Sequence, residues 1–117
     1  MMRSSFTGLE LAIIEPSGYI TAANVEDFQR ELTQAVTSQQ QSAFLIDMHH
    51  VEFLDSAGLM ALVSVFSVAK NLGKRFSLCS LVPSVRIIFE LTQLDNALEI
   101  FEDRRQFEAS FLQKLAA

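Results

Sequence analysis

The segment from Ala43 to Met48 constrains the fold more than any other part of the chain. Its sequence, Ala-Phe-Leu-Ile-Asp-Met, has one charged side chain, Asp47, and no alternation of polar and apolar residues. Strands that are buried on both faces of a parallel sheet have this composition. The sequence therefore predicts a central strand in a mostly parallel sheet.

Extended and helical patterns alternate along the rest of the chain. Residues 9–15 and 19–20 flank the turn sequence Pro16-Ser17-Gly18, and we expect them to pair as an antiparallel hairpin. Asn24 and Pro83 stand where helices start, and Gly73 stands where one ends. Further strands are predicted at 76–80 and 98–101, and helices at 25–36, 56–72, from 83 through 91, and from about 103 onward.

The resulting order is ββαβαβαβα, an α/β sandwich with a mostly parallel sheet and an antiparallel opening hairpin. A chain of 117 residues suits one domain. We expect that domain to span residues 1–117, with an ordered core of about 5–116. Five side chains on apolar faces are predicted to lie in the core: Phe28, Leu45, Leu62, Phe66 and Phe107.

Charge and cysteine content exclude several classes of protein. Nine Lys and Arg against 14 Asp and Glu give a net charge of −5, without a basic stripe for nucleic acid. A single cysteine cannot form an internal disulfide, which favours a reducing, cytoplasmic location. The longest apolar stretch is shorter than the roughly 20 residues that span a bilayer. We expect neither a nucleic-acid partner nor a membrane.

Five polar residues close together in the sequence could suggest a hydrolase: Asp47, His49, His50, Asp55 and Ser56. The nucleophile elbow requires glycine two residues before and two after its serine. Ser56 has Gly58 after it but Leu54 before it. Adjacent His49 and His50 are expected to point in different directions. We therefore expect no catalytic residue here.

Metal and cofactor motifs are also missing. Zinc sites combine about four Cys, His or carboxylate ligands at characteristic spacings, which Cys79 and the histidine pair do not provide. The glycines stand singly, so neither a phosphate-binding loop nor a dinucleotide motif is present. We predict no metal and no cofactor, and expect Cys79 to be a small core residue.

The junction Phe53–Leu59 admits two interpretations. In the first, it is a strand-to-helix corner at which Asp55 or Ser56 caps the helix. In the second, it is a binding site, because a helix N-terminus exposes unpaired N–H groups at the carboxyl edge of a sheet. The small side chains there would keep such a surface flat and open to a partner.

The sequence Asp55-Ser56-Ala57-Gly58-Leu59, after the strand 44–47 and the segment 51–54, resembles the signature of STAS domains (sulfate transporter and anti-sigma factor antagonist). The resemblance extends over nearly the whole chain. Residues 18–28 are similar to the second strand and first helix of the family, and residues 85–94 and 100–103 to its closing helix, loop and strand.

The resemblance implies a non-enzymatic regulatory protein of bacteria. Stand-alone members bind an anti-sigma factor, a serine kinase with a histidine-kinase-like ATPase fold, and thereby free the sigma factor. The kinase phosphorylates the antagonist at the helix start, which breaks the complex, and a serine phosphatase resets it. Carried over to this chain, the partner-binding residues are Asp55, Ser56, Ala57, Gly58 and Leu59.

One position departs from the switchable pattern. Family members that switch have Ser or Thr immediately before the glycine, whereas this chain has Ala57, which lacks a hydroxyl. Ser56 is the nearest hydroxyl, but a shift of one residue turns a helical side chain by about 100°. Ser56 is thus a poor phospho-acceptor candidate, and phosphorylation is not expected to silence this chain.

Two alternatives remain open within the family. The chain could be a scaffold subunit of a larger STAS signalling assembly, or a sensor of a small molecule or nucleotide. A homo-oligomer is compatible with each reading. The transporter-attached class is disfavoured, because no membrane segment precedes the domain.

Overall fold

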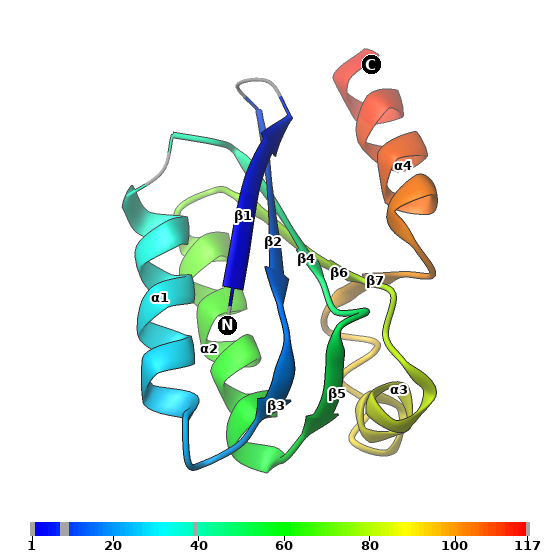
Figure 1. The fold of residues 1–117 in the computed structure, drawn as a ribbon. Helices are drawn as coiled ribbons and strands as arrows, with labels where there is room; N and C mark the ends of the chain where they lie inside the picture. The colour runs from blue at the N-terminus through cyan, green and yellow to red at the C-terminus, as the bar shows by residue number, and fades with distance from the viewer. Residues whose placement is uncertain (1, 8–9, 39, 117) are drawn as a thin grey trace.

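The segment 43–47 forms β4 (Ala43–Asp47), which is buried along its whole length at the centre of a five-stranded sheet. The structure is a computed structural model that describes residues 2–7, 10–38 and 40–116. The strand order in the sheet is β1-β2-β4-β6-β7 (Figure 1). β2 (Leu11–Pro16), β4, β6 (Arg75–Cys79) and β7 (Glu99–Phe101) run parallel, and β1 (Met2–Thr7) pairs antiparallel with β2. The predicted fold class is confirmed.

The opening hairpin consists of different strands from those predicted. β1 pairs with one edge of β2 and β4 pairs with the other, so β2 has no free edge for residues 19–20. β3 (Gly18–Ile20) instead pairs in parallel with β5 (Val51–Leu54) in a separate two-stranded ribbon. The predicted pairing of 9–15 with 19–20 is therefore wrong, and the observed order contains two additional strands, β1 and β5. Residue 9 itself lies outside the described residues.

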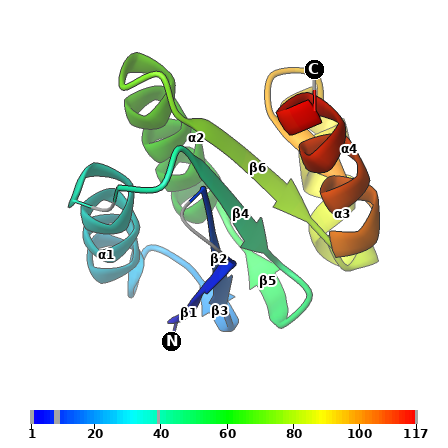
Figure 2. The same cartoon turned by 90° about the horizontal axis from the view of Figure 1, so that it is seen from above.

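Helices cover both faces of the main sheet (Figures 1 and 2). α1 (Val25–Ser38) and α2 (Ser56–Asn71) lie on one face, and α4 (Arg104–Ala116) lies on the other. α3 (Pro83–Leu91) packs beside β5. Among the described residues, no helix is both long and apolar enough to cross a bilayer.

Asn24 directly precedes α1, as predicted, but its side chain accepts from the N–H of Thr21 and donates to the carbonyl of Tyr19, both of which precede the helix. Two other helix ends follow local signals as predicted. Pro83 occupies the first turn of α3. Gly73, with φ of +72°, follows α2, and its N–H donates to the carbonyl of Lys70. The next amide, that of Lys74, donates to the carbonyl of Ala69, which completes a Schellman motif.

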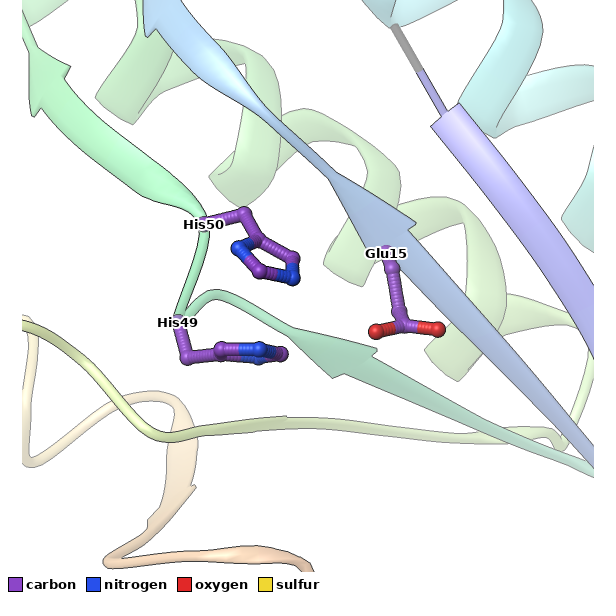
Figure 3. Close-up of side chains that lie close together, drawn as sticks. All are labelled: Glu15, His49 and His50. Carbon is purple, nitrogen blue, oxygen red and sulfur yellow. The ribbon is translucent and has the colours of Figure 1, made fainter.

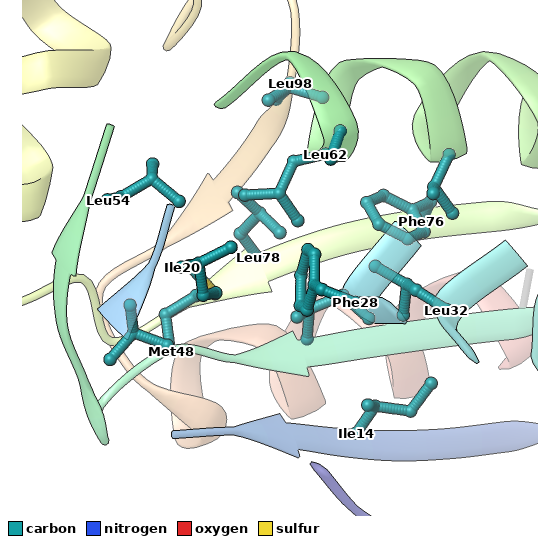
Figure 4. Close-up of a cluster of buried hydrophobic side chains, with 14 of the residues drawn as sticks. Ile14, Ile20, Phe28, Leu32, Met48, Leu54, Leu62, Phe76, Leu78 and Leu98 are labelled. Carbon is teal, nitrogen blue, oxygen red and sulfur yellow. The ribbon is translucent and has the colours of Figure 1, made fainter. Parts of the chain in front are cut away.

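Two apolar cores fill the spaces between sheet and helices. The larger lies under α1 and α2 and contains Phe28 and Leu62 (Figure 4). The smaller lies under α4 and contains Leu45, Cys79 and Phe107. The four phenylalanine and leucine residues named here, and Cys79, are buried, as predicted.

Phe66 does not belong to the buried core, contrary to the prediction. Its side chain is only partly buried, and it packs against the large core from the side. The ring meets Phe76 edge-on, with 6.3 Å between ring centroids. α2 places Leu62 and Val65 inward, and the next residue, Phe66, is consequently turned toward the margin of that face.

Candidate functional site

Asp55 organises the start of α2. Its Oδ1 accepts a hydrogen bond from the backbone N–H of Gly58 at 3.0 Å, so Asp55 is the N-cap, as one of the two interpretations predicted. Its Oδ2 accepts from the backbone N–H of Ala22, also at 3.0 Å, in the connection between β3 and α1. One carboxylate thus joins two segments that are far apart in the sequence. The hydrogen bonds from Gly58 and Ala22 hold the pKa of Asp55 below its usual value.

Gly58 allows α2 to sit directly on the β3–β5 ribbon. A Cβ atom built at this position would lie 2.6 Å from the carbonyl oxygen of Ile20 and 2.7 Å from a methyl carbon of Leu54. Both distances are shorter than real contacts of a Cβ atom, so any larger residue at position 58 would force α2 or the ribbon to move. In the sequence, Gly58 is identifiable only as part of a motif, because its packing role depends on the distant residue Ile20.

We call residues Asp55–Leu59 the α2 corner. Of these, Ser56 is exposed, and Asp55 and Ala57 are partly buried. Gly58 and Leu59 are buried, Leu59 as part of the large core. The surface of the corner therefore consists of Asp55, Ser56 and Ala57, while the other two residues shape it from below.

An exposed aromatic pair lies on the β3–β5 ribbon, whose strand β5 leads directly into the α2 corner. Tyr19 of β3 and Phe53 of β5 are opposite one another in the ribbon, with ring centroids 6.1 Å apart. Tyr19 is 60% exposed and Phe53 is 45% exposed, whereas their neighbours Ile20 and Leu54 are fully buried. Tyr19 was not recognised as a site residue, because its position depends on the pairing of β3 with β5.

The polar residues near the end of β4 form a second cluster, separate from the α2 corner. Asp47, only 2% exposed, accepts hydrogen bonds from His49 Nδ1 at 2.8 Å and from Arg104 Nε at 2.6 Å. Burial alone would raise the pKa of Asp47, but the hydrogen bonds from Arg104 and His49 outweigh it, and the pKa lies below the usual value. β5 separates this cluster from Asp55 and Ser56. The five residues weighed as a hydrolase site thus do not share one location.

The two histidines do not point apart, contrary to the prediction. Their ring centroids are 3.7 Å apart, and both rings lie toward Glu15 at the end of β2 (Figure 3). His49 and His50 form the tight turn between β4 and β5. The side-chain alternation of a strand therefore does not apply to them.

The STAS domain family model matches residues 7–107 of the chain. The chain belongs to the STAS domain family.

The relatives of this STAS domain include anti-sigma factor antagonists. BtrV of Bordetella bronchiseptica, which carries that name, is 26% identical over 104 residues, covering 89% of this chain and 87% of BtrV. A solved anti-sigma factor antagonist from Mycobacterium paratuberculosis has a TM-score of 0.82 at 21% identity, with 93% of this chain and 92% of that chain covered. SpoIIAA, a Bacillus cell fate determinant, has a TM-score of 0.76 at 15% identity in its unphosphorylated form, with 94% and 96% covered. At 15% and 21% identity, the similarity to these two solved structures shows that the fold is shared.

Proposed function

We propose that this STAS domain is a regulatory binding protein of the anti-sigma factor antagonist type. Its partner is an anti-sigma factor with serine kinase activity and a histidine-kinase-like ATPase fold, and it acts in the cytoplasm without catalysing a reaction itself. The partner docks on the α2 corner and on the adjacent aromatic pair, Tyr19 and Phe53.

The observation that carries this proposal is the composition of the surface around the start of α2. Exposed Ser56 and partly exposed Ala57 are small, and Tyr19 and Phe53 remain largely exposed on the adjoining ribbon. Aromatic side chains are enriched at protein interfaces, where they bury a large area at low entropic cost. Asp55, which caps α2 and also accepts a hydrogen bond from the N–H of Ala22, gives this surface a fixed shape.

The residue at position 57 decides how such a surface is regulated. Among the solved neighbours of this fold, SpoIIAA is known in a phosphorylated form. A phosphoryl group adds about −1.5 to −2 charge at neutral pH and would disrupt a docked surface by repulsion and desolvation. Ala57 cannot accept that group, so we propose that a kinase partner binds this domain without silencing it. A serine phosphatase is then not needed to reset the domain.

Hydrogen exchange with and without a partner tests the location of the interface. The probes are the purified histidine-kinase-like anti-sigma factors of the source organism, each mixed with the intact domain. We expect the binding partner to slow amide exchange over residues 19–22 and 53–60. Protection confined to α4, on the opposite face of the sheet, would place the interface elsewhere and overturn the proposal.

A further inference from the structure

Two imidazoles and one carboxylate converge where β2 and β4 end (Figure 3). Glu15, His49 and His50 each offer one ligand atom, and these atoms lie within 4.8 Å of one another. The proposed docking of a protein partner uses none of these residues. The spacing of Cys79 and the histidine pair predicted no metal site, but the pairing of β2 with β4 adds Glu15 from a distant segment. We propose that Glu15, His49 and His50 form a binding site for a divalent transition-metal ion of the zinc class.

The ligand atoms need only small movements to close around an ion. Ligands of one tetrahedral zinc ion lie about 3.3 Å apart, given bonds of about 2.0–2.1 Å. His50 is exposed, so its ring can turn toward the ion, whereas the ring of His49 is held at Nδ1 by Asp47. The Glu15 side chain, 17% exposed, holds a more fixed position at the end of β2.

The hydrogen bond to Asp47 prepares His49 for metal binding. An ionised carboxylate can only accept, so Nδ1 of His49 is the donor, and in the neutral ring Nε2 is the nitrogen with the free lone pair. Carboxylates that orient a metal-binding histidine in this way are a regular feature of metal sites. Asp47 is itself held by Arg104, which makes it a positioning residue for this site.

Backbone hydrogen bonds hold the two ligand-bearing segments together. The N–H of Gly18, just after β2, donates to the carbonyl of His50 at 2.9 Å. The N–H of Val51 donates to the carbonyl of Met48 at 3.0 Å and closes the turn that carries both histidines. β2 and β4 pair directly in the sheet, which brings Glu15 to the same edge as this turn. The ligands therefore stand on a rigid frame.

The donor set and the local charge indicate the kind of ion. Two imidazoles with one carboxylate suit zinc, nickel or copper, whereas magnesium and calcium prefer oxygen ligands only. Arg104 binds Glu15 Oε1 at 3.0 Å, which leaves the second oxygen of that carboxylate for the ion. The two negative charges of Glu15 and Asp47 exceed the single positive charge of Arg104. The site therefore has a net negative charge, which favours binding of a dication. Three protein ligands leave the fourth tetrahedral position for water.

Calorimetric titration of the full chain with Zn²⁺ tests the site, and the Co²⁺ absorption spectrum reports its coordination. We expect one ion per chain and a spectrum typical of four-coordinate cobalt. His50→Ala and Glu15→Gln should each weaken Zn²⁺ binding by at least about tenfold. Glu26→Gln, which removes an exposed carboxylate of α1, is the matched control and should bind as the wild type does.

Two outcomes would overturn the proposal. In the first, His50→Ala binds Zn²⁺ with wild-type affinity. In the second, one ion binds per two chains and the chain dimerises on adding zinc, which would mean that the histidines bridge copies instead of forming a site within one chain. Thermal unfolding in EDTA verifies that each variant is folded. If Glu15→Gln is not folded, the result for His50→Ala, at an exposed position, decides the test. Because the titration contains only metal and this chain, its result is independent of the protein partner.

Discussion

The carbonyl oxygen of Ile20 lies so close to the Cα of Gly58 that a Cβ atom at position 58 would approach it to 2.6 Å. The neighbouring Cγ2 of Ile20 would lie at 2.9 Å. α2 therefore rests on the backbone of β3 with no side chain between them. This contact fixes where the α2 corner stands relative to the aromatic pair of the ribbon.

Gly58→Ala is expected to destabilise the domain by about 1–3 kcal/mol, although alanine is the better helix former by about 1 kcal/mol. The added methyl group must push α2 away from β3. Ser56→Ala, at an exposed position in the same turn, is the matched control and should change the free energy of unfolding by less than about 0.5 kcal/mol. Urea unfolding of the two variants provides the comparison. Equal stability of Gly58→Ala and the wild type would mean that α2 does not pack on β3 as described.

The two phenylalanines that were both predicted to lie in the core should behave differently. Phe107 is fully buried and contacts Phe101 and Phe111, with ring centroids 5.4 and 5.6 Å away. Truncation to alanine should cost about 3–5 kcal/mol at Phe107 and clearly less at partly buried Phe66. Thermal or urea unfolding gives the ranking, and a larger loss at Phe66 would contradict the described burial.

Signals within one segment were sufficient to predict much of the fold. The apolar run of β4, the cap at Asp55 and the helix end at Gly73 each depend on residues a few positions apart. β1 was missed because its sequence, Met-Arg-Ser-Ser-Phe-Thr, is too polar to show a strand pattern. β5 was missed as a strand because it has only four residues and follows a turn directly.

The site was less predictable, because its parts meet only through tertiary pairing. Asp55 and Ser56 were identified from a local motif, whereas Tyr19 reaches Phe53 only because β3 pairs with β5. Glu15 meets His49 for a similar reason, since β2 and β4 are neighbours in the sheet despite their separation in sequence. A pattern within one segment cannot show which distant segment lies beside it.

Acid should weaken the domain partly through Glu99. Burial raises the pKa of Glu99, but hydrogen bonds from Arg75 and Ser77 outweigh this effect and hold the pKa below the ordinary value of 4.5. Because the folded-state pKa is lowered, this stabilisation is present above about pH 4.5 and is lost as the pH falls through the lower folded value. Glu99→Gln should be less stable than the wild type at neutral pH by about 1 kcal/mol, since the pair is partly exposed.

The difference between wild type and Glu99→Gln isolates this contribution, because the other carboxylates titrate in both proteins. We expect that difference to shrink as the pH is lowered below about 4.5. Urea unfolding across pH 3–7 measures it. A difference that stays constant over the whole range would show that Glu99 does not titrate with folding.

Ala57→Ser should convert the domain into a kinase substrate. The substitution adds one hydroxyl at the position that accepts the phosphate in switchable family members, and the side chain of Ala57 is only partly buried. With an anti-sigma factor kinase that binds the domain and ATP, intact mass spectrometry should show one phosphate on the variant and little on the wild type. The double variant Ser56→Ala with Ala57→Ser is the control and should still be phosphorylated. Stoichiometric phosphorylation of the wild type on Ser56 would refute the role given to Ala57.

Calorimetric titration of that kinase with Ala57→Asp tests whether the partner docks on the α2 corner. The added carboxylate imitates part of the charge of a phosphate beside Asp55, and it should weaken binding by about 1–3 kcal/mol if the α2 corner is desolvated in the complex. Gln34→Glu adds the same charge at an exposed position on α1 and should leave the affinity unchanged. We expect a selective loss of affinity in Ala57→Asp, whereas wild-type affinity in Ala57→Asp would show that the partner does not dock on the α2 corner.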